Sequence, residues 1–115
     1  MSIAIRFRAE PLRSLAFGAT APTYMSVGTE LNFPARIINV QNLTDQSMLF
    51  SFDGVVDHFI LPSGGFILLD VTGNRTITTG FFIAEGTQLF VKWANPDGPA
   101  PQSGGVYFSA FHSEL

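Results

Sequence analysis

Large apolar residues recur at every second position in several short stretches of the chain, which is the period of a β-strand. The clearest case lies between Met48 and Asp70, where three apolar runs are separated by two turn signals, DGVVD and PSGG. In the first run, Met48, Phe50 and Phe52 occupy alternate positions. Strands so close in sequence pair antiparallel, because a parallel crossover needs about a dozen residues or more. This stretch therefore predicts a small antiparallel β-module.

The same pattern recurs outside this stretch, and it predicts the fold class. Further strands are expected at residues 36–41, 81–84, 87–93 and 106–112. Residues 66–71 lack polar alternation, which predicts a strand covered on both faces. No helical pattern exceeds one turn. We expect an all-β protein, an antiparallel β-sandwich of jelly-roll or Greek-key-like type with about seven to nine short strands.

The chain divides into residues 1–22, an N-terminal arm or first strand, and residues 23–115, the sandwich domain. Apolar residues alternate from Ile3 to Phe7, and Pro11 interrupts any extension of that strand. Three of the six positive charges lie in this region: Arg6, Arg8 and Arg13. They fit either a solvated edge strand whose charges block aggregation or an arm that docks on a neighbouring subunit.

Composition points to assembly. Charged residues make up 13% of the chain, about half of the usual share, while 46% of residues are hydrophobic and 12 are Phe. Such a small domain either hides these residues in a Phe-rich core or leaves apolar surface that a partner covers. The net charge of −3 and the single lysine argue against nucleic-acid binding. No run approaches the ~20 apolar residues of a membrane span.

The last two predicted strands carry aromatic residues on both faces. Either both faces are covered within the domain, or one forms a subunit contact, since aromatics are enriched at interface centres. The candidate interface residues on these strands, beside the three arginines, are Phe90, Tyr107 and Phe111. A Pro- and Gly-rich loop at residues 94–105 lies between the two strands and offers a further docking element.

Catalytic and metal-binding patterns are missing from the sequence. His58 and His112 have no second histidine at ligand spacing, and Asp53 and Asp57 are better explained as turn residues around Gly54. There is no cysteine, no G-x-S-x-G elbow and no phosphate-binding glycine loop. The sequence therefore predicts no enzyme, no metal site and no cofactor.

One long segment carries a family resemblance. Residues 36–70 read RIINVQNLTDQSMLFSFDGVVDHFILPSGGFILLD, and the later pieces EGT at 85–87, LFVK at 89–92 and SGGVY at 103–107 continue the pattern. Over residues 34–111 it resembles a family of small virion proteins of tailed bacteriophages. The resemblance implies a β-sandwich that is associated with the capsid or the tail and located in the virion after assembly in the host cytoplasm.

Three functions remain open. The first is a capsid decoration or cement protein that stabilises contacts between major capsid subunits. The second is a tail or neck component, such as an adaptor ring or a fibre anchor. The third, of another class, is a host-glycan binding module using exposed aromatics such as Tyr24, Phe90 or Trp93. The expected partners are the major capsid protein or tail and neck proteins of the same virion, and further copies in a homo-oligomer, with no nucleic acid and no membrane. The contacts are expected in the arm, the 94–105 loop and the last two strands, with 48–70 serving as scaffold.

Overall fold

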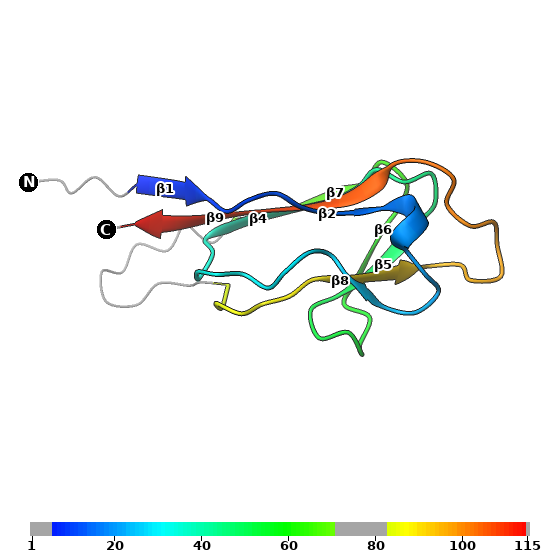
Figure 1. Cartoon of the computed structure of the whole chain (residues 1–115), viewed down its shortest axis with the longest axis horizontal. Coiled ribbons are helices and arrows are strands. Elements are labelled where there is room, and N and C mark those ends of the chain that lie inside the picture. Colours follow the sequence, from blue (N-terminus) through cyan, green and yellow to red (C-terminus); the bar gives the residue numbers. More distant parts are fainter. Residues whose placement is uncertain (1–5, 71–82, 115) are drawn as a thin grey trace, which may run out of the picture.

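The structure is a computed structural model that describes residues 6–70 and 83–114. Two antiparallel sheets of five and four strands pack face to face as a sandwich (Figure 1). Within the described residues there is no α-helix, and one 3₁₀ turn spans Phe17–Ala19. The predicted all-β antiparallel sandwich is therefore confirmed.

The five-stranded sheet is organised around β9 (Gly105–Glu114). On one side β9 pairs with β1 (Arg6–Ala9) and, further along, with β2 (Arg13–Ala16). On its other side it pairs with β4 (Ile37–Asn42), and β4 pairs with β7 (Phe66–Asp70). The N-terminal segment 6–16 thus forms one edge of this sheet.

The second sheet has the order β3 (Met25–Ser26), β8 (Phe90–Trp93), β5 (Met48–Ser51) and β6 (Phe59–Leu61). The hairpin expected over 81–84 and 87–93 is only partly visible, because residues 81 and 82 lie outside the described residues. Ile83 forms an isolated bridge with Ala35, and β8 begins only at Phe90.

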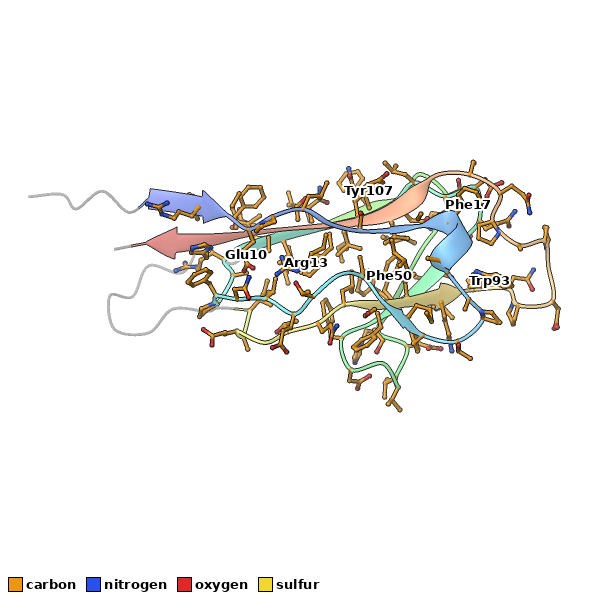
Figure 2. All side chains as sticks on the ribbon, in the orientation of Figure 1. Glu10, Arg13, Phe17, Phe50, Trp93 and Tyr107 are labelled. Carbon is orange, nitrogen blue, oxygen red and sulfur yellow. The ribbon has the colours of Figure 1, made fainter. Side chains whose placement is uncertain are left out.

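The core lies between the two sheets and follows the strand period. In β4 the buried residues alternate with half-buried ones, so Ile38 and Val40 face inward. They meet Phe50 and Val91 of the opposite sheet, and Figure 2 shows Phe50 between the two layers. Full burial of such a side chain stabilises the fold by about 1.5–3 kcal/mol.

A buried ion pair ties the N-terminal segment to the domain. The Arg13 guanidinium contacts a Glu10 carboxylate oxygen at 2.8 Å and also donates to the carbonyls of Thr29 and Glu30, at 2.6 and 2.8 Å (Figure 2). Burial raises the pKa of Glu10, but hydrogen bonds from the Asn32 N–H and from Arg13 bring that pKa below its ordinary value. Arg13 is therefore an internal structural residue. Neither of the two roles considered for the N-terminal charges, a solvated edge strand or a docking arm, describes it.

The side chain of Asn42, at the end of β4, connects three segments of the chain. Its amide nitrogen donates to the carbonyls of Gln46, Leu61 and Pro62, at 2.8, 3.0 and 3.2 Å. Its amide oxygen accepts from the N–H and the hydroxyl of Thr44. The side chain is completely buried, so it has no water to replace these partners.

We expect Asn42→Ala to lower the free energy of unfolding by on the order of 3 kcal/mol, because it removes the hydrogen bonds of a buried amide and leaves the buried Thr44 N–H without its side-chain acceptor. Urea denaturation followed by circular dichroism measures this change. The control is Asn32→Ala at an exposed position, where we expect a change within about 0.5 kcal/mol. A loss for Asn42→Ala no greater than for the control would contradict the role assigned to Asn42.

Candidate functional site

The outer face of the five-stranded sheet is rich in apolar side chains. The pairing registers of β7, β4 and β9 place nine residues on this face in three rows. The rows are Phe66, Gln41 and Tyr107; Leu68, Asn39 and Ser109; and Asp70, Ile37 and Phe111. Asp70 is the one charged residue among the nine. Figure 2 shows Tyr107 on the side of the sheet that faces away from the core.

Strand β7 is the open edge of this face. Its four apolar residues are all exposed, with exposed fractions of 64% for Phe66, 39% for Ile67, 57% for Leu68 and 43% for Leu69. Within the described residues β7 pairs with β4 alone. Edge strands usually carry a charge, a proline or a bulge that prevents pairing with another chain, and residues 66–69 carry neither charge nor proline.

The prediction that residues 66–71 are covered on both faces is wrong for the described part of this strand, since every residue of Phe66–Asp70 is exposed. The physical reason is strand order. A strand with apolar side chains on both faces needs cover on both, but β7 lies at the sheet margin. Burial of this strand therefore requires cover from beyond the described residues.

The six predicted interface residues do not form one cluster. Tyr107 and Phe111 lie half-buried on the outer face, on β9, which β4 separates from β7. Phe90 lies on the other sheet, under the backbone of Gly54, where an added Cβ would be 3.5 Å from its ring. Arg6 and Arg8 lie on β1, where Arg8 is exposed, and Arg13 is buried.

Sequence reasoning missed Phe66, Leu68 and Ile37 as members of this surface. The uninterrupted apolar run FILL at 66–69 was the available signal. Such a run indicates a strand buried on both faces, and the sequence pattern does not say whether the cover comes from the same chain.

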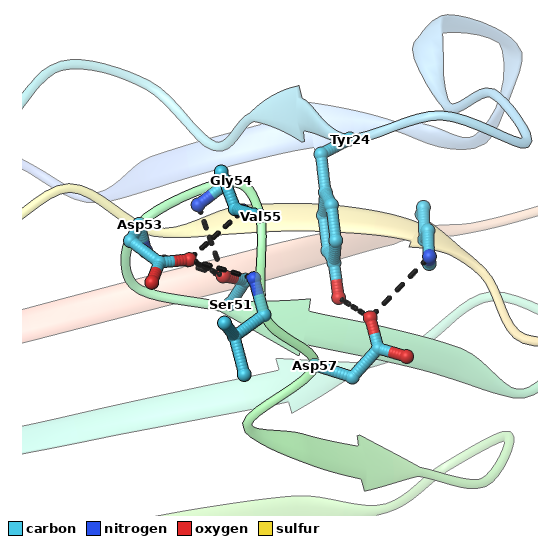
Figure 3. Close-up of polar contacts among 8 residues, drawn as sticks. Tyr24, Ser51, Asp53, Gly54, Val55 and Asp57 are labelled. Atoms are coloured by element: carbon cyan, nitrogen blue, oxygen red, sulfur yellow. Dashed lines mark hydrogen bonds and ion pairs between the residues drawn. The ribbon is translucent and has the colours of Figure 1, made fainter.

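A second exposed feature is the loop between β5 and β6, which a hydrogen-bond network holds in place (Figure 3). The Asp53 carboxylate accepts the N–H groups of Val55 and Val56, at 2.8 and 2.9 Å, and the Ser51 hydroxyl. Gly54 has a φ of 76°, which favours glycine there. The interpretation of Asp53 as a turn residue is confirmed.

The same loop is fixed at its other end by Asp57. Tyr24 donates its hydroxyl proton to this carboxylate, and Lys92 lies 3.3 Å from it (Figure 3). The hydrogen bond from Tyr24 lowers the pKa of Asp57. Burial is the main cause that raises the pKa of Tyr24, and the hydrogen bond to Asp57 raises it further. These contacts present Val55, which is 79% exposed, at the tip of an ordered loop.

The aromatics considered for glycan binding are engaged with the chain itself. The Tyr24 ring lies below the Lys92 ammonium at 4.7 Å, in addition to its bond with Asp57. Trp93 is half-buried and donates its indole N–H to the Thr20 hydroxyl at 2.8 Å. Together with the covered ring of Phe90, they form no shared open platform.

The predicted docking loop folds back onto the domain. Pro101 is buried, and the Gln102 N–H donates to the Asp45 carboxylate at 2.8 Å. A cleft of about 130 Å³ lies between this loop and Trp93. Within the described residues, no group of three or more histidine, aspartate or glutamate side chains is placed so that it could hold a metal ion. No helix in that part of the chain is long and apolar enough to cross a membrane.

The loop network gives a pH-dependent prediction. Hydrogen bonds from Val56, Val55 and Ser51 lower the pKa of Asp53 to about 2. Because the pKa is depressed in the folded state, the stabilisation is present above pH 3.8, the ordinary value, and is lost as the pH falls toward 2. We expect the carboxyl carbon of Asp53 to titrate near pH 2 by NMR, and Ser51→Ala to raise that midpoint. A midpoint at or above 3.8 would contradict the network.

Comparison of the chain with protein-family models, with curated proteins and with solved structures returns no match. What the molecule does must therefore be inferred from its own residues and geometry. The outer face of the five-stranded sheet, with β7 as its open edge, is the feature best suited to support such an inference.

Proposed function

We propose that this chain is a bacteriophage virion structural protein, and specifically a capsid decoration or cement protein that stabilises contacts between major capsid subunits. The observation that carries the proposal is the largely uncharged outer face of the five-stranded sheet, which ends in strand β7, whose residues are all exposed. The resemblance of residues 34–111 to small virion proteins of tailed bacteriophages supports the virion assignment and favours neither the capsid nor the tail.

The physics of cementing fits this surface. A cement protein acts by burying surface between subunits, which requires apolar area and backbone edges but no reactive groups. The outer face supplies apolar area from three strands, with one charge among its nine residues. Only one charge has to be desolvated when this face is covered, and Gln41, Asn39 and Ser109 would need hydrogen-bond partners there, while the apolar atoms contribute to binding by burial.

The test uses two matched variants on opposite sheets. Leu68 and Ile60 are both 57% exposed, and both lie on edge strands. Ile60 belongs to β6, and it faces outward because its partner Leu49 lies between the core residues Met48 and Phe50. A lysine on an exposed strand edge is well tolerated for folding, so each variant should stay folded.

We expect Leu68→Lys to weaken binding to purified capsids assembled without this protein by about tenfold or more, since it removes apolar burial and places a charge in the contact. Ile60→Lys should bind within about twofold of wild type. Co-sedimentation with the capsids measures binding, and circular dichroism verifies folding. Equal binding by Leu68→Lys and wild type would refute the role of this face.

The number of copies in the virion separates the capsid assignment from the tail or neck alternative, which would use the same surface. Hundreds of copies of this protein per virion, measured on a stained gel of purified particles, would support the capsid role. A dozen copies or fewer would overturn it in favour of a tail or neck role. Failure of the wild-type chain to co-sediment with capsids would also count against the cement assignment.

A further inference from the structure

We propose that β7 pairs antiparallel with β7 of a second copy of this chain, with the two-fold axis at Ile67, so that two five-stranded sheets join into one continuous sheet. This inference goes beyond the virion assignment, because it requires nothing but the chain itself. It names the occupant of the open edge, the register of the contact and the residues that meet there.

The backbone of β7 has the right phase for this pairing. The Asn42 N–H donates to the Gly65 carbonyl at 2.9 Å, and the Asn42 carbonyl accepts the Gly64 N–H at 2.8 Å, so a bulge at Gly64 and Gly65 closes the β4–β7 ladder with a hydrogen-bonded pair. Such pairs recur at every second residue of an antiparallel ladder, so Ile67 and Leu69 direct their N–H and C=O groups toward β4. Phe66 and Leu68 direct theirs toward the open edge.

A second copy fits this edge because the edge is self-complementary. With the axis at Ile67, Phe66 lies opposite the partner's Leu68, and Leu68 lies opposite the partner's Phe66. The two residues of each pair exchange two backbone N–H···O=C hydrogen bonds, which gives about four hydrogen bonds between the copies. An isologous two-fold contact needs this kind of self-matching.

Charge selects this register over its neighbour. With the axis at Leu68, Phe66 would lie opposite the partner's Asp70, which places a carboxylate against an aromatic ring. With the axis at Ile67, Asp70 lies opposite the partner's Gly64 and outside the apolar contact. Residues 66–69 carry no charge, so two copies with a net charge of −3 bring no like charges together along these residues.

The buried area sets the strength of the contact. With about 200 Å² for a large side chain, the exposed fractions of Phe66, Ile67, Leu68 and Leu69 amount to on the order of 400 Å² per copy. A stable interface buries about 800 Å² per partner. The strand contact therefore belongs to the weak, reversible class of interfaces.

Cysteine cross-linking tests the register. The chain has no cysteine, so each single-cysteine variant reports one position. Two copies of Ile67→Cys face each other as a pair without hydrogen bonds, about 4.5 Å apart at Cα, which a disulfide can span. Two copies of Leu68→Cys lie on a diagonal of about 7–8 Å, beyond that range.

We expect mild oxidation to convert most of Ile67→Cys to a covalent dimer of twice the 12.5 kDa chain mass, with little dimer from Leu68→Cys or from Val55→Cys on the exposed loop. Efficient cross-linking of Leu68→Cys and not of Ile67→Cys would overturn this register. Equal cross-linking of all three variants would reveal random collision and would overturn the site.

Sedimentation equilibrium tests the contact without cross-linking. Wild type and Ile60→Lys should show a dimer at high micromolar concentration with Kd values within about twofold, and Leu68→Lys should raise the Kd at least tenfold. A wild type that stays monomeric at these concentrations overturns self-pairing. If Leu68→Lys still loses capsid binding in that case, β7 contacts a capsid subunit and the proposed function stands. A wild-type chain that dimerises but does not bind capsids would support the pairing of β7 and would contradict the proposed function.

Discussion

The hydrogen bonding of β9 along both of its sides is the interaction on which the rest of the structure depends. This strand pairs with β1 and β2 on one side and with β4 on the other, and its residues Val106, Phe108 and Ala110 are buried against the opposite sheet. The strand therefore joins segments from both ends of the described chain. These pairings are long-range in sequence, so loop-closure entropy must be overcome before they form.

The central position of β9 leaves the five-stranded sheet with two very different margins. The β1–β2 margin is tied down by the buried pair of Glu10 and Arg13, whose bonds reach the carbonyls of the neighbouring segment. The β7 margin has apolar side chains on both faces and no charge before Asp70. One margin is thus fixed to the domain, and the other leaves the side chains of β7 exposed. The proposed function and the proposed pairing both depend on this asymmetry.

Local sequence patterns predicted the features that depend on neighbouring residues. Alternation in 36–41 and 48–53 identified two central strands, and Asp53 with Gly54 identified a turn. Strand order depends on contacts between distant segments, so the same patterns could not say that residues 66–70 lie at an edge. Arg13 looked like a surface charge because nothing near it in sequence reveals the distant carbonyls that it binds. Gly104 also depends on a segment that is distant in sequence, since a Cβ at this position would lie 1.8 Å from the Leu43 carbonyl oxygen.

The contacts of Asn42 also bear on the chemical ageing of the molecule. An asparagine amide that hydrolyses becomes a carboxylate, and here the new oxygen would face the carbonyl oxygens of Gln46, Leu61 and Pro62 with no donor between them. The native fold holds this amide completely buried, which keeps it away from water. A chain damaged at Asn42 while unfolded would place a negative charge where three acceptors converge, and it would be selected against at refolding. The hydrogen bonds that connect these segments thus also make the fold sensitive to chemical change at Asn42.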